Sequence, residues 1–101
     1  MLINIQTTRQ AIGILSSIST VNSCKIISLL EKEPDLELPE ISKKIGLDEK
    51  LTHYSIEKMR KSGVILSRRI ERKHYVFCIN PHIHEQLMKL LGNFCRLEIM
   101  Q

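Results

Sequence analysis

Three observations predict a mainly α-helical domain that carries one small β-hairpin. Residues 39–65, PEISKKIGLDEKLTHYSIEKMRKSGVI, indicate a short helix, a glycine turn, an amphipathic helix and a glycine stop, the outline of a helix-turn-helix. Residues 66–79, LSRRIERKHYVFCI, indicate two strands joined by a basic turn. Residues 81–101 carry apolar side chains at heptad spacing. A helix-turn-helix followed by a basic hairpin is a winged helix, so we predict that fold, with the first and last helices forming a dimer interface.

Size and composition favour one soluble domain spanning 1–101. A chain of 101 residues with 43% hydrophobic and 26% charged residues is typical of a single globular unit. Its apolar runs are shorter than the roughly 20 residues that span a bilayer, and we expect no signal peptide or membrane partner. Three cysteines, an odd number, suit a reducing compartment rather than a disulfide framework. The expected location is the cytoplasm.

Positive charge is concentrated in the middle of the chain. The segment from Lys43 to Tyr75 contains ten Lys and Arg residues and four acidic residues, a net charge of +6, whereas the whole chain carries +4. The remainder is therefore at −2. Such a distribution favours a surface that meets phosphates.

The first half of the chain is predicted to form two helices ahead of the helix-turn-helix. The first covers Leu2 to Ser19 and is taken as a dimerisation helix, 1–19. The second covers Ser23 to Lys32 and opens the winged-helix core, 23–79, and the Glu33-Pro34-Asp35 segment ends it.

Local signals define the later elements. Leu36 and Leu38 are expected in a very short strand, and Pro39 at the first position of the third helix. Asp48 is expected to cap the fourth helix, at about 48–62, and Gly63 to end it. Asn80-Pro81 should open the last helix, the C-terminal dimerisation helix 81–101.

The last helix has apolar residues at steps of 4, 3, 4 and 3. Such a seam requires another helix to cover it. Packing on the protein's own core is one interpretation; the one we favour in so small a chain is a homodimer interface. The first helix would share it, and the predicted interface residues are Ile12, Leu15, Ile83, Leu87, Leu90, Phe94 and Leu97.

The fourth helix is predicted to turn Thr52, Ile56 and Met59 to the core. Its opposite stripe could be a merely solvated face, but a basic hairpin follows it, which favours nucleic acid. Likewise, the hairpin tip could be a simple solvated turn, although its cations suit phosphates or the minor groove. The predicted DNA-binding residues are Lys50, His53, Tyr54, Lys58, Lys61, Arg68, Arg69, Arg72 and Lys73.

Residues 46–65, GLDEKLTHYSIEKMRKSGVI, resemble the helix-turn-helix of the ArsR/SmtB family, and RRIERKHYVFCI resembles its wing. The resemblance implies a homodimer, held by its first and last helices, that binds a palindromic operator near a promoter. This chain departs from the family at His53-Tyr54-Ser55, where the family usually has Ser-Arg-His, and its wing lacks the common glycine. The operator is therefore not predictable from the resemblance.

The resemblance also implies ligand sites to compare. The family's third-helix thiolate site needs cysteines, which Leu38-Pro39-Glu40-Ile41 lacks. The spacing of its last-helix metal site is matched by His82, His84, Cys95 and Glu98, which could share an ion such as zinc only across two antiparallel helices of a dimer. A redox variant of the family would pair Cys24 with Cys95. We expect no cofactor, with zinc or a similar divalent metal as the alternative, and we expect Cys78 to be buried.

No nucleophile and base, phosphate loop or carboxylate pair is evident, so no enzymatic activity is expected. The main interpretation is a sequence-specific regulator of transcription that binds double-stranded DNA, a homodimeric repressor. One alternative is a winged helix that binds an acidic protein partner. The other is a metal- or thiol-responsive version of the repressor.

Overall fold

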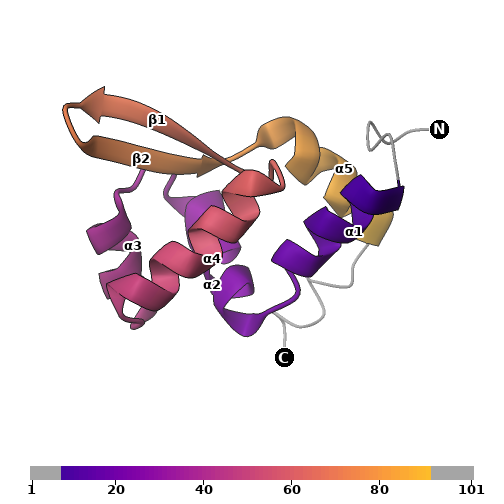
Figure 1. The fold of residues 1–101 in the computed structure, drawn as a ribbon, viewed down its shortest axis with the longest axis horizontal. Helices are drawn as coiled ribbons and strands as arrows, with labels where there is room; N and C mark the ends of the chain where they lie inside the picture. Colours follow the sequence, from indigo (N-terminus) through magenta and orange to yellow (C-terminus); the bar gives the residue numbers. More distant parts are fainter. Residues whose placement is uncertain (1–7, 92–101) are drawn as a thin grey trace.

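The computed structural model describes residues 8–91, except the side chains of residues 8, 10, 11 and 87–91. Five helices and one two-stranded antiparallel sheet follow one another in this range. The hairpin lies over the central helices, and α1 and α5 are both at the end of the molecule opposite the hairpin tip (Figure 1). The elements are α1 (Thr8–Ser17), α2 (Val21–Lys32), α3 (Leu38–Ile45), α4 (Glu49–Lys61), β1 (Ile65–Glu71), β2 (His74–Ile79) and α5 (Pro81–Leu91).

Polar caps determine where the helices begin. The amide of Ser23 donates to Thr20 Oγ1 at 3.1 Å, so α2 begins at Val21 and not at Ser23 as predicted. The first helix ends at Ser17 and not at Ser19 as predicted, because the amide of Ser19 donates to Ser16 O at 3.4 Å, an i−3 bond that does not continue the α-helix. The predicted start of that helix at Leu2 lies outside the described residues.

Asp48 and Asn80 are the caps that the sequence predicted. Asp48 Oδ1 accepts from the amide of Leu51 at 2.9 Å, and Asn80 Oδ1 accepts from the amide of His82 at 3.1 Å. Gly63, at φ +89°, follows the end of α4 in the left-handed region that glycine favours. The boundaries of α4 are therefore confirmed.

The cap at Asp48 is expected to stabilise the folded protein. We expect Asp48→Ala to lower the free energy of unfolding by about 1 kcal/mol, because the first turn of α4 loses a hydrogen bond and a favourable charge at its positive end. Urea denaturation followed by circular dichroism measures the change. Asp48→Asn, which retains an acceptor oxygen, should recover most of the loss; equal losses in both variants would contradict the assignment of the cap.

The predicted strand at Leu36 and Leu38 is reduced to a single bridge. Leu36 O accepts from the amide of Phe77 at 2.8 Å, and the amide of Asp35 donates to Phe77 O at 3.1 Å. Leu38 instead begins α3, because Glu37 is its cap, which places Pro39 at the second helical position and not the first. The bridge ties the α2–α3 loop to the wing.

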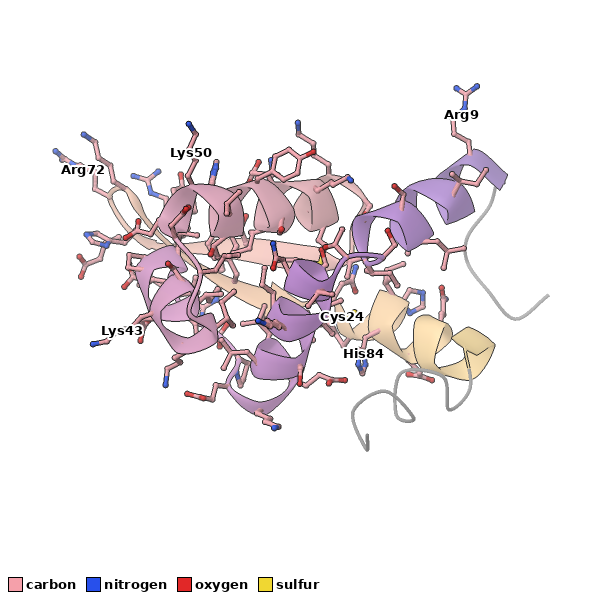
Figure 2. The ribbon with its side chains drawn as sticks, turned by 90° about the horizontal axis from the view of Figure 1, so that it is seen from below. Arg9, Cys24, Lys43, Lys50, Arg72 and His84 are labelled. Atoms are coloured by element: carbon pink, nitrogen blue, oxygen red, sulfur yellow. The ribbon has the colours of Figure 1, made fainter. Side chains whose placement is uncertain are left out.

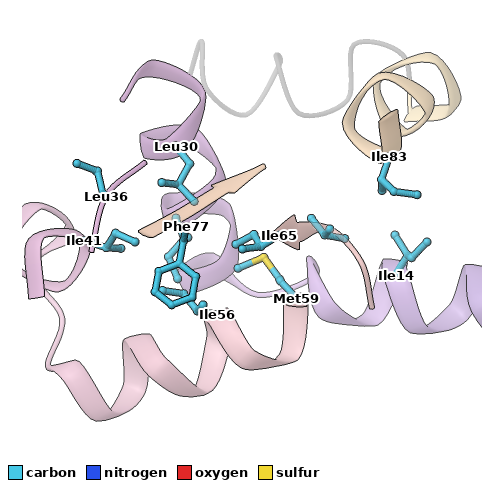
Figure 3. Close-up of a cluster of buried hydrophobic side chains, with 11 residues drawn as sticks. Ile14, Leu30, Leu36, Ile41, Ile56, Met59, Ile65, Phe77 and Ile83 are labelled. Carbon is cyan, nitrogen blue, oxygen red and sulfur yellow. The ribbon is translucent and has the colours of Figure 1, made fainter. Parts of the chain in front are cut away.

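The core lies beneath α4 and the hairpin. Thr52, Ile56 and Met59 have no exposed surface, as the helical spacing predicted. Side chains from the helices and both strands converge on one apolar cluster (Figure 3). It consists of Ile14, Ile26, Leu30, Leu36, Ile41, Ile56, Met59, Val64, Ile65, Phe77 and Ile83.

The predicted interface residues separate into two groups. Ile83 is only 9% exposed and points toward Ile14 within the same chain, so it packs in the core and does not remain available for a dimer (Figure 3). The core cluster, which also contains Ile14, covers Ile83 at this position. Ile12 and Leu15 are 61% and 40% exposed, in keeping with an interface. The side chains of Leu87, Leu90, Phe94 and Leu97 lie outside the description.

The wing is an antiparallel hairpin with a tight basic turn at Arg72 and Lys73. Its ladder pairs Arg69 with Tyr75 and Glu71 with His74, so the register shifts around Ile70. Lys73 has φ +65°, a conformation in which glycine is the usual residue. Cys78, expected to be buried, is only half-buried, although its strand neighbours Val76 and Phe77 are buried.

Candidate nucleic-acid interface

One face of α4 is buried and the opposite face presents cations. Lys50, His53, Lys58 and Lys61 are exposed, and Tyr54 is 66% exposed. Lys50 projects to the same side of the molecule as Arg72 of the wing turn (Figure 2). The helix and the wing therefore contribute to one basic surface, as the sequence indicated.

Tyr54 and Lys58 are one turn apart on this exposed face. Lys58 Nζ lies 5.9 Å from the centroid of the Tyr54 ring, a cation–π distance. The contact orients an aromatic ring and a cation together toward solvent. A phenol and an ammonium in this arrangement can donate hydrogen bonds to phosphate oxygens.

Glu57 and Arg60 form a bidentate ion pair on α4 that the sequence analysis did not include. Arg60 Nε lies 2.9 Å from Glu57 Oε2, and Arg60 Nη2 lies 2.8 Å from Glu57 Oε1. The hydrogen bond from Arg60 is the main cause that lowers the pKa of Glu57, against a smaller opposing effect of burial. Their i, i+3 spacing was the signal available in the sequence. Because Arg60 neutralises this carboxylate, Glu57 repels phosphate less than its charge suggests.

Contrary to the prediction, the four wing cations do not form one cluster at the hairpin tip. Arg72 and Lys73 occupy the turn, and Arg69 lies just before it. Arg68 lies further back in β1, where Nη2 is 3.6 Å from Asp35 Oδ2. Successive strand residues point to opposite faces, which separates Arg68 from Arg69. The exposed tip therefore contains three cations, and the fourth is held beside the α2–α3 loop.

His74 connects the wing to the helix-turn-helix. Its Nδ1 lies 3.0 Å from Glu37 Oε1, at the residue that caps α3. Both residues line an open groove of about 630 Å³ between α3, α4 and the wing, whose lining also includes His53 and Glu57. Neither residue of the pair was predicted as functional, since they are far apart in the sequence.

The pair is expected to make the stability of the wing depend on pH. The hydrogen bond to Glu37, then the charge of Glu37, raises the pKa of His74 above its ordinary value of 6.5. The stabilisation is therefore complete below about pH 6.5 and is lost as the pH rises through the higher pKa of the folded protein. We expect His74→Asn to reduce the change in the urea midpoint over this interval. His53→Asn is the control, and an unchanged pH profile in His74→Asn would refute the link.

The predicted metal and redox residues are only partly described. His84 Nε2 lies 2.6 Å from Glu31 Oε2, and this contact joins α5 to α2. His82 Nε2 lies 3.2 Å from Gln86 Nε2. Cys24 is exposed on α2. Cys95 and Glu98 lie outside the described residues, so both ligand sets remain predictions. Within the described part of the chain, no three His, Cys, Asp or Glu side chains are grouped as a metal would require.

Burial raises the pKa of the Cys78 thiol, and the charge of Asp35 adds to the effect, while Arg68 opposes it. This thiol is therefore a weaker nucleophile at neutral pH than an ordinary exposed cysteine.

Among the described helices, none combines the length and apolar character of a membrane span.

Comparison with known proteins agrees with this geometry. Residues 20–65 match the family described as winged helix-turn-helix DNA-binding. The chain is also 39% identical over 69 residues to the HTH-type transcriptional regulator FL11 of Pyrococcus furiosus. That match includes 68% of this chain but only 38% of the length of the relative.

Solved structures share the fold at low sequence identity. One is the homodimeric winged helix-turn-helix DNA-binding domain of Mb0332 from Mycobacterium bovis, described as a possible ArsR-family transcriptional regulator. It has a TM-score of 0.74 at 14% identity, over 87% of this chain and 80% of that chain. Another is the transcriptional repressor BigR from Xylella fastidiosa, with a TM-score of 0.67 at 17% identity, over 85% and 86% of the two chains. At these identities the likeness establishes the fold.

Proposed function

Because this chain is a winged helix-turn-helix protein with the fold of ArsR-family regulators, we propose that it is a sequence-specific regulator of transcription that binds double-stranded DNA. The observation that carries the proposal is the shared basic surface of α4 and the wing, on which Lys50 and Arg72 project to the same side. In this arrangement α4 enters the major groove, and the wing reaches the neighbouring backbone or minor groove. We assign it no catalytic role.

The proposed active form is a homodimer. The exposed Ile12 and Leu15 of α1 support it, because two large apolar side chains on one exposed face are stabilised by a second copy. The homodimeric state of the Mb0332 domain is consistent with it. A dimer with twofold symmetry binds a palindromic operator whose half-sites lie about one helical turn apart.

The proposed regulatory effect is repression in the cytoplasm. BigR, which has the same fold, is a transcriptional repressor. Binding to an operator that overlaps a promoter obstructs polymerase by itself, so the proposed effect requires only DNA binding.

Selection of bound duplexes from a random pool, followed by measurement of affinity at increasing salt, tests the proposal. We expect enrichment of a palindromic sequence and an affinity that falls with a log-log slope of about −0.9 for each phosphate contacted. Failure to enrich any sequence would refute the proposal. A salt-independent interaction with an acidic protein would support the interaction module instead.

A further inference from the structure

We propose that the DNA-binding surface continues from α4 onto α1, where Arg9 binds a backbone phosphate of the same duplex. This inference rests on the proposed function and adds a third element to the helix and the wing. Arg9 lies on the far side of α4 from the wing tip, so the contact would lengthen the bound segment of DNA (Figure 2).

The orientation of the side chains is the first argument. Figure 2 shows Arg9, Lys50 and Arg72 projecting to one side of the molecule, whereas Lys43 of α3 points elsewhere. Arg9 is exposed. Three cations from three separate elements thus face the same direction, as contact with one extended polyanion requires.

The attachment of α1 to α4 is the second argument. Ile14 is fully buried in the core, and Ser17 Oγ lies 2.8 Å from Ser62 Oγ just after α4. These contacts hold α1 in a defined position relative to the recognition helix. Arg9, two turns before Ser17, is therefore carried by a helix whose position is set by the core.

The stripe of α1 that contains Arg9 is suited to close approach. Gly13 and Ser16 follow Arg9 at i+4 and i+7, on the same stripe of the helix, and both are exposed. A Cβ atom added at Gly13 would have no atom within 4 Å, so this stripe faces open space. The buried Ile14 lies on the other side of the helix, whereas the exposed Ile12, at i+3 from Arg9, borders this stripe, so the proposed dimer and DNA surfaces of α1 are neighbours.

Charge is the third argument. Arg9 is the one charged residue in the sequence of α1, TRQAIGILSS, so no carboxylate of this helix competes with a phosphate for it. In contrast, Arg60 is held by Glu57, and Arg68 lies beside Asp35. Arg9 can therefore engage a phosphate without first breaking an ion pair within its own helix.

The test measures the salt dependence of binding to the duplex that the full-length wild-type protein selects. Arg9→Gln should make the slope of log affinity against log salt concentration shallower by about 0.9, because one phosphate contact is lost. The ratio of the affinity at 50 mM salt to that at 200 mM salt should therefore fall by about threefold. Lys43→Gln is the matched control on another side of the molecule and should retain the wild-type slope. If Arg9→Gln also retains it, the inference is wrong.

Substitution of Gly13 provides a second measurement that leaves Arg9 in place. Gly13→Lys and Gly13→Glu both improve the helix propensity of α1 and add side chains of similar length to the same stripe. We expect tighter binding by several-fold for Gly13→Lys and weaker binding by several-fold for Gly13→Glu. Equal affinities would count against the inference, whereas a wild-type protein that binds no duplex would refute the proposed function itself.

Discussion

Replacing Arg69 and Arg72 together with glutamate should weaken duplex binding by about 100-fold at physiological salt. Both side chains are exposed at or beside the wing turn, so the variant removes two phosphate contacts and introduces two repulsive charges. The free energy of unfolding should change little, since neither residue contributes to the core. Fluorescence anisotropy with a labelled operator duplex measures the affinity, and thermal denaturation verifies the fold.

The matched control is Arg68→Gln, one residue away in the same strand. Its guanidinium lies 3.6 Å from Asp35, which already compensates its charge. We expect this variant to keep an affinity within about threefold of wild type. If Arg68→Gln were as damaging as the double variant, the wing would contact DNA through the middle of β1 and not through its tip.

Replacing Ile56 with alanine should lower the free energy of unfolding by about 3 kcal/mol. Ile56 has no exposed surface, and its truncation removes apolar contacts and leaves a cavity between α4 and the rest of the core. In a domain of this size such a loss is a large part of the total stability. Urea denaturation at several protein concentrations measures it and also reveals any contribution from dimerisation.

Tyr54→Ala, two residues earlier on the same helix, should affect DNA binding and not stability. Tyr54 is exposed, so its removal should change the free energy of unfolding by less than about 1 kcal/mol, while binding to the operator weakens. The two substitutions thus separate the core face of α4 from its outer face. A strongly destabilised Tyr54→Ala, or a stable Ile56→Ala, would contradict the orientation of this helix.

Much of the fold could be predicted because it is specified locally. The apolar spacing of α4, its cap at Asp48 and the left-handed residue at Gly63 all act within a few residues of one another. One error missed a local signal, because Leu38 begins a helix that the adjacent Glu37 caps together with Glu40. The other depended on a neighbour in space, because Leu36 pairs with Phe77, some forty positions away. Propensity alone does not encode such a partner.

The candidate site shows the same division. The helical periodicity was sufficient to place Lys50 and Tyr54 on the outer face of α4, because residues opposite a buried apolar stripe are exposed to solvent. It could not reveal the pairs between Arg68 and Asp35 or between His74 and Glu37, whose members are distant in the sequence. Knowing these pairs changes which wing cations remain available for phosphate.

By itself the sequence determined the order of the elements, the buried face of α4 and the basic character of the wing, since each depends on short-range spacing and on charge. Only the tertiary structure decided that Ile83 belongs to the core and that Arg9 faces the same side as Lys50. Both follow from how the helices are held by the core: Ile83 shares its cluster with Ile14, and α1 is attached to the end of α4. The direction of a side chain relative to a distant helix depends on how the helices pack, a property of the whole core that no local pattern contains.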